Sequence, residues 1–344
     1  MGLNYQTVLW NKQKKGYDRI LVLLLVMYLL LFAVLTLVTN SQTSLETLII
    51  RAFGSLAIVM LHVVLSIGPL ARLNSKFLPL LYNRRHLGVS MFLVAAVHGV
   101  FSIIQFHTLG NVNPLVSLFT SNMDYTSLVN FPFQVLGFLS LLILFVMAAT
   151  SHDFWLHNLG PKVWKSLHMM VYLAYFMIIL HVFLGAFQQE TSPVLLTSVG
   201  AGMVTLLFLH LKAGVKEVSA DATGSHDSWV YVCHLDDIKE NRAKTICIDE
   251  ERIAVYKYSG KLSAVNNVCR HQGGPLGEGK IVDGCITCPW HGYQYQPANG
   301  QSPPPFTEKV ETYYLKLEDG KVYVNPKANA PGTEVEPLNI SAYG

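Results

Sequence analysis

Long apolar runs separated by short polar segments occupy the first two thirds of this 344-residue chain. A helix needs about 20 apolar residues to cross a hydrocarbon core, and six runs approach that length. They lie near residues 20–39, 52–70, 87–106, 132–150, 167–187 and 193–211. The first run, Ile20 to Val38, is too long for a signal-peptide core, and no small-residue cleavage site follows it. The pattern therefore predicts a six-helix transmembrane α-bundle over residues 1–216.

The pattern changes after Lys216. Residues 217–227 are polar, small and acidic, which is typical of a flexible linker. Short runs of β-type residues follow from Ser228, and charged or Ser-Gly turns separate them. The chain is thus predicted to be multi-domain, with a small all-β domain over 228–326 and a C-terminal tail over 327–344.

Composition and charge support a membrane location for the first part. Hydrophobic residues make up 51% of the chain and charged residues only 14%, which departs from ordinary globular usage. The Lys and Arg residues of this part lie in segments on one side of the predicted spans, with Arg51 as the exception. By the positive-inside rule, both termini and the all-β domain are predicted to be cytoplasmic, and the loop 107–130 to lie outside. The same topology explains the net charge of +3, so no nucleic-acid partner is expected.

Two short loops of the all-β domain each combine one cysteine with one histidine. Cys269-Arg-His271 is followed, after sixteen residues, by Cys288-Pro-Trp-His291-Gly292. A Rieske-type [2Fe-2S] cluster needs that mixture, because two thiolates bind one iron and two imidazoles bind the other. Zinc is the main alternative, since Cys₂His₂ zinc sites use the same ligands, but zinc fingers pair like with like. The mixed halves favour the iron-sulfur cluster.

The chain around these loops resembles Rieske ferredoxin-type domains over about 228–326. The matching motifs are Gln272-Gly-Gly-Pro-Leu-Gly277, Asp283-Gly-Cys-Ile-Thr-Cys-Pro-Trp-His-Gly292 and Pro303-Pro-Pro-Phe306. The resemblance implies four cluster ligands: Cys269, His271, Cys288 and His291. The remaining cysteines are expected to be small buried residues in a reducing compartment: Cys233, Cys247 and Cys285.

Two tyrosines near the second loop suggest how the cluster is tuned. The Rieske proteins of quinol-oxidising bc complexes have a serine where this chain has Tyr293, whereas Tyr295 matches their tyrosine. Fewer hydrogen bonds to the cluster sulfurs imply a lower reduction potential, and Tyr295 is the remaining candidate donor. We therefore expect a low to intermediate, ferredoxin-like potential.

Several histidines lie inside the predicted spans, where polar side chains are costly and usually face a bundle interior. His98 lies toward the outer half of the third span. His181 reaches a similar depth, because it lies thirteen residues, about 20 Å of helix, beyond His168 at the inner boundary. Two histidines at one depth on neighbouring helices are what an axially ligated haem needs. For each histidine alone, hydrogen-bonded packing is an equally open interpretation.

An inner haem would need His168 and a partner near the cytoplasmic face. His86 has the right depth, whereas His62 lies nearer mid-membrane and is expected to pack through a hydrogen bond. On an ideal helix His168 and His181 would lie about 140° apart, so periodicity alone does not establish two ligands. The histidines at span ends are expected to be solvated at the interface: His107, His152, His157 and His210.

The spans also carry motifs of a known family. They are Gly68-Pro-Leu-Ala-Arg72, Arg84-Arg-His-Leu-Gly88, His98, and Trp164-Lys-Ser-Leu-His168 followed by His181. Through them, residues 50–190 resemble the ferric reductase-like transmembrane domain, most of all the haem-b membrane subunit of bacterial methionine sulfoxide reductase systems. The resemblance implies one or two b-type haems in a bacterial inner membrane, with His98, His168 and His181 as ligands. The NADPH oxidases of this superfamily have a histidine where this chain has Arg84, so the fourth ligand, His86 or another, stays open.

Together these features predict transmembrane electron transfer. A cytoplasmic reductase or ferredoxin-like donor would reduce the cluster, and electrons would pass through haem to an acceptor at the outer face or to a quinone. A separate donor is expected, because no Gly-x-Gly-x-x-Gly follows a predicted strand. No catalytic residue is assigned, and no 2-His-1-carboxylate iron domain of an oxygenase follows the cluster domain. Two alternatives stay open: quinol-linked donation to a cytoplasmic oxygenase-type partner, and a redox-sensing or structural subunit of a larger membrane complex.

Overall fold

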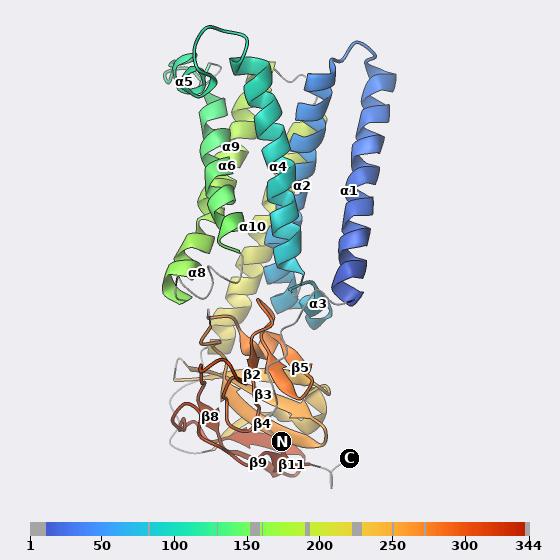
Figure 1. Ribbon diagram of the computed structural model, residues 1–344. Coiled ribbons are helices and arrows are strands. Elements are labelled where there is room, and N and C mark those ends of the chain that lie inside the picture. The colour runs from blue at the N-terminus through green and yellow to red at the C-terminus, as the bar shows by residue number, and fades with distance from the viewer. Residues whose placement is uncertain are drawn as a thin grey trace.

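The computed structural model consists of a bundle of helices with a β-domain at one end of it (Figure 1). It describes residues 12–81, 83–128, 130–151, 159, 161–189, 193–221, 229–249, 251–271 and 273–340. A helical N-terminal region followed by a β-sheet domain agrees with the predicted order of the two parts.

The apolar runs of the sequence form the helices of the bundle. Their bounds are α1 Lys12–Thr39, α2 Leu45–Leu73, α3 Leu78–Leu81, α4 Arg84–His107, α5 Pro114–Thr120, α6 Phe133–Ala149, α8 Pro161–Met169, α9 Val171–Gln189 and α10 Pro193–Asp221, with a 3₁₀ turn at Ser75–Phe77. Among the described residues, five helical segments are long and apolar enough to cross a membrane: Lys15–Thr39, Leu45–Leu73, Arg84–His107, Ser166–Ala186 and Val194–Lys216.

The fourth predicted span, 132–150, is the shorter apolar helix α6, which has 17 residues. Pro132 precedes its first turn. At the other end, the hydroxyl groups of Thr150 and Ser151 each donate to a carbonyl of the last turn at 2.7 Å. Such hydroxyls compete with backbone donors for those carbonyls. At 1.5 Å per residue α6 is about 26 Å long, near the lower limit for a membrane span.

The fifth predicted span, 167–187, is not one continuous helix. Helix α8 ends at Met169, Met170 lies in a turn, and α9 starts at Val171. His168 therefore belongs to α8 and His181 to α9. The ideal helical phase that would separate these two side chains does not apply across the break, because each residue follows the axis of its own helix.

Helix α2 packs against both α4 and α10, and α6 packs against α9. Contacts between α4 and α6 join these two groups, while α1 lies against α2 at the edge of the bundle (Figure 1). Leu61, Ala174 and Val199 are among the most buried residues of the shared apolar core. This arrangement brings α2, α4, α6 and α9 together around the interior, and two of the predicted haem ligands lie on α4 and α9.

Helix α10 runs out of the bundle and contacts the first part of the β-domain (Figure 1). It continues to Asp221, so residues 217–221 are helical although they were expected to start a linker. Helix geometry lets successive turns form without an apolar face as long as each amide finds its carbonyl four residues back. The rest of that predicted linker, 222–227, and the predicted domain start at Ser228 lie outside the described residues.

The β-domain contains three small antiparallel sheets. Its strands are β1 Val230–His234, β2 Arg242–Ile248, β3 Glu251–Tyr258, β4 Lys261–Asn266, β5 Lys280–Val282, β6 Cys285–Thr287, β7 Gln294–Tyr295, β8 Thr312–Tyr313, β9 Leu315–Glu318, β10 Lys321–Val324 and β11 Leu338–Asn339. The sheet orders are β1-β10-β9, β11-β4-β3-β2 with β8 also on β4, and β5-β6-β7.

Three hairpins of this domain turn through a residue followed by glycine. Ser259-Gly260 joins β3 to β4, Asp283-Gly284 joins β5 to β6, and Asp319-Gly320 joins β9 to β10, all with positive φ. Two successive positive φ angles define a type I′ turn, whose twist matches that of the flanking strands. The Ser-Gly and Asp-Gly pairs in the sequence therefore set the register of the sheets that support the cysteine loops.

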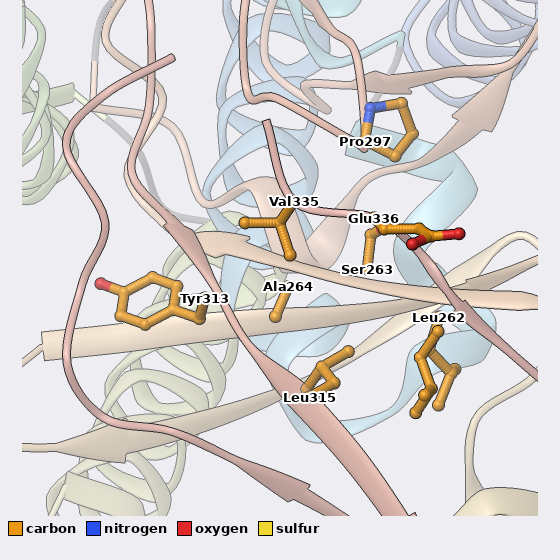
Figure 2. Close-up of a pocket in the computed structure, with 9 residues that line it drawn as sticks. Leu262, Ser263, Ala264, Pro297, Tyr313, Leu315, Val335 and Glu336 are labelled. Carbon is orange, nitrogen blue, oxygen red and sulfur yellow. The ribbon is translucent and has the colours of Figure 1, made fainter. Parts of the chain in front are cut away.

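The predicted C-terminal tail, 327–344, is partly integrated into this domain. Its strand β11 pairs with β4, and Ile340 is only 5% exposed. Where the tail crosses β4, Leu262, Ser263, Val335 and Glu336 line a small pocket (Figure 2). The edge of β4 beside β8 offers backbone groups that this segment satisfies, and the predicted boundary at 326 stays a prediction.

Candidate metal centre and intramembrane histidines

The two cysteine loops share one backbone design. In the first loop, the Cys269 N–H donates to the Gly274 carbonyl at 2.9 Å, and Gly273 N–H donates back to the Cys269 carbonyl at 2.7 Å. In the second, Cys288 N–H donates to the Tyr293 carbonyl at 2.8 Å, and Gly292 donates to the Cys288 carbonyl at 2.9 Å. Gly273 and Gly292, whose amides donate to the cysteine carbonyls, have positive φ angles of 73° and 75°. The Cys-x₃-Gly spacing thus folds each loop around its own cysteine.

The four predicted ligands lie on these loops, with the two thiols next to each other and the two imidazoles next to each other. Cys269 and Cys288 are each 1% exposed, and their thiols contact each other. The rings of His271 and His291 lie edge to face with centroids 5.6 Å apart. Two adjacent thiols beside two adjacent imidazoles are the donor set that a [2Fe-2S] cluster takes, with like ligands on each iron.

The surroundings also fit a bound metal group. The Nδ1 atom of His291 is buried and makes no hydrogen bond to any described residue, and the Nδ1 atom of His271 is buried too. A buried polar nitrogen is costly unless something satisfies it, and a metal ion does so. A Cβ at Gly274 would lie 2.7 Å from the Cys288 sulfur, so only glycine leaves room beside that thiol.

Without metal, the ionisation of these ligands reflects their burial. Burial, followed by the neighbouring Cys269, raises the pKa of Cys288 well above its ordinary value. Burial, followed by the positive charge of His271 and then of Arg85, lowers the pKa of His291. Neutral imidazole is the form that binds metal, whereas a thiol must lose its proton when metal binds. Metal binding at these ligands would therefore release protons from the cysteines and none from His291.

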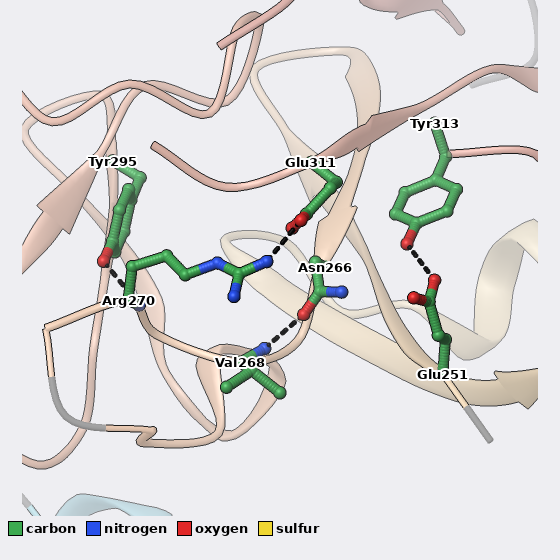
Figure 3. Close-up of polar contacts among 7 residues, drawn as sticks. All are labelled: Glu251, Asn266, Val268, Arg270, Tyr295, Glu311 and Tyr313. Carbon is green, nitrogen blue, oxygen red and sulfur yellow. Dashed lines mark hydrogen bonds and ion pairs between the residues drawn. The ribbon is translucent and has the colours of Figure 1, made fainter. Parts of the chain in front are cut away.

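Tyr295 contacts the first cysteine directly. Its hydroxyl oxygen accepts the Arg270 N–H at 2.9 Å and lies 3.4 Å from the Cys269 sulfur. A cysteine sulfur that binds iron has lost its proton, so with a cluster present the Tyr295 hydroxyl would be the donor to that sulfur. Burial raises the pKa of Tyr295 far above its ordinary value, so the hydroxyl stays protonated as a donor. Arg270 in turn forms an ion pair with Glu311 (Figure 3).

Polar and aromatic contacts hold the imidazole of His271 and the backbone beneath the first loop in place. The His271 ring stacks on Tyr293 with centroids 4.5 Å apart and planes at 7°, and the Tyr293 hydroxyl donates to Glu308. Beneath the first loop, Val268 N–H donates to the Asn266 side chain at 2.9 Å (Figure 3). The His271 orientation is therefore fixed by residues of the second loop and of 303–309.

In the bundle, the structure brings His98 and His181 together. Their rings lie edge to face with centroids 6.2 Å apart. The Nδ1 atom of His98 hydrogen-bonds the Ile50 carbonyl at 2.9 Å, and that of His181 the Phe133 carbonyl at 2.8 Å. In both residues Nδ1 is thus the protonated nitrogen and Nε2 carries the lone pair that a metal needs.

The spacing of these two rings fits one metal between them. A metal–imidazole bond is about 2 Å long and the ring centre lies about 1 Å beyond the nitrogen, so two axial imidazoles have centroids about 6 Å apart. The observed 6.2 Å agrees with that distance. The residues present therefore fit a b-type haem bound by His98 and His181.

Two glycines make this arrangement possible, and the sequence analysis missed them. A Cβ at Gly54 would lie 2.8 Å from Nδ1 of His98, and one at Gly137 would lie 2.7 Å from Nδ1 of His181. Each glycine stands four residues after the accepting carbonyl, at Ile50 and Phe133. In a regular helix, each of these carbonyls accepts the amide N–H of the glycine four residues further on. The imidazole reaches the same carbonyl because glycine has no side chain in the way. The signal was an Ile-x₃-Gly and a Phe-x₃-Gly near the N-terminal ends of α2 and α6.

The remaining intramembrane histidines make other contacts. His168 hydrogen-bonds the Trp164 carbonyl through Nδ1 at 3.1 Å. Nδ1 of His86 pairs with Asp18 of α1 at 2.8 Å. His62 lies 3.0 Å from the Tyr175 hydroxyl, which agrees with the hydrogen-bonded packing expected for it.

One expectation about span-end histidines is wrong. His107 is 5% exposed and its two ring nitrogens lie 3.0 Å from Ser117 and from Gln134, so it joins α4 to α5 and α6 instead of being solvated. The short helix α5 covers it, which a hydropathy pattern does not reveal. His152 and His157 lie outside the described residues.

All five cysteines are buried and free of disulfides. Burial raises the pKa of Cys233 and of Cys285 to about 11 in each case, so both remain thiols at neutral pH. These two residues behave as the small apolar residues that were expected.

The fold and these sites define the class of the protein: an electron-transfer oxidoreductase with apolar membrane-type helices and a Rieske iron-sulfur domain. Residues 51–179 match the family model of the ferric reductase like transmembrane component, and residues 228–314 match that of the Rieske [2Fe-2S] domain. The chain belongs to the Rieske family through its second part, and in the same polypeptide it carries a ferric reductase-like transmembrane domain, as the motifs predicted.

Relatives of the Rieske part include ferredoxins of oxygenase systems. The ferredoxin subunit of anthranilate 1,2-dioxygenase from Burkholderia cepacia is 31% identical over 98 residues, covering 28% of this chain and 91% of that protein. The ferredoxin component of the alkene monooxygenase system from Xanthobacter autotrophicus is 29% identical over 97 residues, covering 28% and 80%. Apoptosis-inducing factor 3 from Homo sapiens is 28% identical over 100 residues, covering 29% of this chain but only 16% of that protein.

Among solved structures, the ferredoxin of carbazole 1,9a-dioxygenase from Nocardioides aromaticivorans aligns with a TM-score of 0.28 at 23% identity. This alignment covers 29% of this chain and 99% of the ferredoxin.

Proposed function

We propose that this protein passes electrons across a membrane, from a donor on the side of the Rieske domain, through a [2Fe-2S] cluster and b-type haem, to an acceptor at the opposite face or a quinone. The observation that carries the proposal is the union of two redox-competent sites in one chain, the Cys269–His271 and Cys288–His291 loops and the facing His98–His181 pair. A hydrocarbon core about 30 Å thick separates the faces, so a relay inside the lipid is needed.

The cluster would be held by Cys269, Cys288, His271 and His291, and it would supply one-electron redox chemistry at the base of the bundle. An outer haem would be held by His98 and His181. A second, inner haem would be held by His168, and we propose His86 as its partner through Nε2, because Asp18 already engages Nδ1. A carboxylate on Nδ1 raises the basicity of the other nitrogen, which favours ligation.

The proposed location is a bacterial inner membrane with six spans, in which α6 supplies the sixth, and with both termini and the Rieske domain in the cytoplasm. The positive-inside distribution of Lys and Arg supports this orientation. The electron donor is proposed to be a separate cytoplasmic reductase or ferredoxin-like protein.

A second candidate reverses the flow, with quinol oxidised in the membrane and electrons leaving through the Rieske domain to an oxygenase-type partner. The relatives named as ferredoxin components of monooxygenase and dioxygenase systems favour it. The two directions predict opposite orders of midpoint potential, since electrons move spontaneously toward the higher potential.

Purified full-length protein tests the proposal. Iron, acid-labile sulfide and haem are quantified, and the potentials of cluster and haem are measured on one sample by absorption and electron paramagnetic resonance. A cluster with a potential below that of the haems supports transfer from the Rieske domain into the membrane, and the reverse order supports the second candidate. Zinc in place of a two-iron centre, or a preparation that binds no haem after reconstitution, would refute both.

A further inference from the structure

One aromatic side chain lies between the Rieske loops and the membrane domain. The ring of Trp164, on α8, stacks on His168 with centroids 3.7 Å apart and planes at 25°. The same ring also meets His291 edge to face, with centroids 5.0 Å apart. Trp164 is 7% exposed, so no solvent layer separates it from these neighbours.

We propose that Trp164 is the bridge through which electrons pass between the Rieske centre and His168 of α8. The proposal rests on the proposed function, since it assumes a cluster at His291 and a haem at His168. Each transfer moves one electron, which leaves the cluster and reduces one haem iron from the ferric to the ferrous state. Trp164 undergoes no net redox change and keeps its proton.

The position of Trp164 is fixed by more than the two histidines. Its indole Nε1–H donates to the Thr150 carbonyl at 3.3 Å, at the end of α6. Trp290, the residue before His291, packs on it with centroids 6.0 Å apart. A single ring is therefore in contact both with residues of the bundle and with residues of the second cysteine loop, and close packing of this kind limits its movement.

The two domains are also joined beside this contact. Arg72, at the end of α2, lies 3.8 Å from the Glu278 carboxylate, which follows the first cysteine loop. Lys216 of α10 donates to the Arg72 carbonyl at 2.7 Å. The Lys216 bond steadies Arg72 within the bundle, and the Arg72–Glu278 pair does not involve Trp164, so removing the indole leaves a second attachment between the domains.

The assignment separates the roles of the two imidazoles. His291 meets Trp164 and faces the membrane domain, whereas His271 stacks on Tyr293 within the Rieske domain. The donor would then deliver electrons elsewhere on the cluster than the His291 edge, and His291 would serve as the exit.

The test uses the full-length protein in lipid nanodiscs, with cluster and haem contents verified. A photoreduced flavin in solution reduces the cluster in a flash under anaerobic conditions, and haem reduction is followed by its absorbance. The variants are Trp164→Leu, which removes the ring, and Trp164→Phe, which keeps an aromatic side chain. The matched control is Trp229→Leu, because Trp229 packs on Lys316, another residue of the Rieske domain.

We expect transfer from cluster to haem in Trp164→Leu to slow by about tenfold or more, equivalent to about 1.4 kcal/mol in the barrier. The transfer rate should fall less in Trp164→Phe than in Trp164→Leu, and the rate in Trp229→Leu should equal that of the wild type. Ferric haem accelerates the spin relaxation of the reduced cluster, and this effect falls steeply with the distance between them. In samples frozen immediately after the flash, before transfer, this relaxation must stay unchanged in all variants.

Two results would overturn the bridge. One is an unchanged rate in Trp164→Leu, and the other is a slower rate accompanied by lost relaxation enhancement, which would make Trp164 a docking contact only. If the proposed function itself is wrong, the wild type will already show no electron transfer from the reduced cluster to a bound haem.

Discussion

The imidazole rings of His98 and His181 lie edge to face, 6.2 Å apart, and each is anchored through Nδ1 to a backbone carbonyl of another helix. The helix pairs α2/α4 and α6/α9 thereby repeat one arrangement, a histidine on one helix and a carbonyl followed by glycine on the other. The anchoring fixes both the tautomer and the direction of the free nitrogen, as is common for metal-binding histidines.

Enlarging either glycine should therefore weaken the haem site proposed at His98 and His181. In Gly137→Ala the new methyl group would lie 2.7 Å from Nδ1 of His181 and would displace the ring from the Phe133 carbonyl. Loss of such an outer contact typically costs about 10–100-fold in metal affinity. Haem titration of the purified apoprotein, followed by absorbance, measures the effect. Gly200→Ala on α10 is the control, since nothing lies within 4 Å of its Cβ position, and equal affinities in the two variants would contradict the assignment.

The cysteines should divide into cluster ligands and packing residues. Cys269→Ala or Cys288→Ala removes one of the two adjacent thiols and should abolish the cluster. Cys285→Ala, on the neighbouring strand β6, should keep the cluster and lose only about 1 kcal/mol of stability. Acid-labile sulfide and the electron paramagnetic resonance signal of the reduced protein distinguish these outcomes. A cluster that survives Cys288→Ala but disappears in Cys285→Ala would show that the ligand set is wrong.

The cluster loops could be predicted from local sequence because their chemistry and geometry are local. The mixed Cys-x-His and Cys-x-x-His pairs and the glycine four residues after each cysteine lie within a few positions of one another. The pairing of His98 with His181 was predicted from depth alone, and the structure places the rings side by side. Whether they bind haem stays a prediction.

Features that depend on packing between distant segments could not be predicted in this way. The break at Met170 lies inside the apolar run predicted as one span, and the length of such a run does not show where a helix is interrupted. The contact of Trp164 with His291 depends on the path of α10, which places the β-domain under the bundle (Figure 1). His107 is buried where α4 meets the short helix α5, although its position at the end of a span suggested solvation at the interface.

Tyr295 should raise the potential of the cluster. Its hydroxyl donates to the Cys269 sulfur, and a donor stabilises the reduced, more negative cluster more than the oxidised one. Removing one such hydrogen bond in Tyr295→Phe is worth about 1 kcal/mol, or about 40 mV downward for a one-electron couple. Redox titration followed by electron paramagnetic resonance measures the shift. Tyr258→Phe, which loses a hydroxyl contact to Ser263 away from the loops, should leave the potential unchanged.

The number of haems depends on His168 and its partner. If His168 and His86 hold an inner haem, the wild type binds two haems per cluster, and His168→Ala retains only the one held by His98 and His181. His86→Ala should give the same stoichiometry as His168→Ala, since a haem that loses one axial ligand is bound far more weakly. Haem per protein is measured by the pyridine haemochrome absorbance, with iron-sulfur content as the internal standard. A His86→Ala variant that keeps both haems would exclude His86 and leave His168 with another ligand. His62→Ala is the control, because that histidine is already engaged with Tyr175, and loss of haem from it would point to His62 as the ligand.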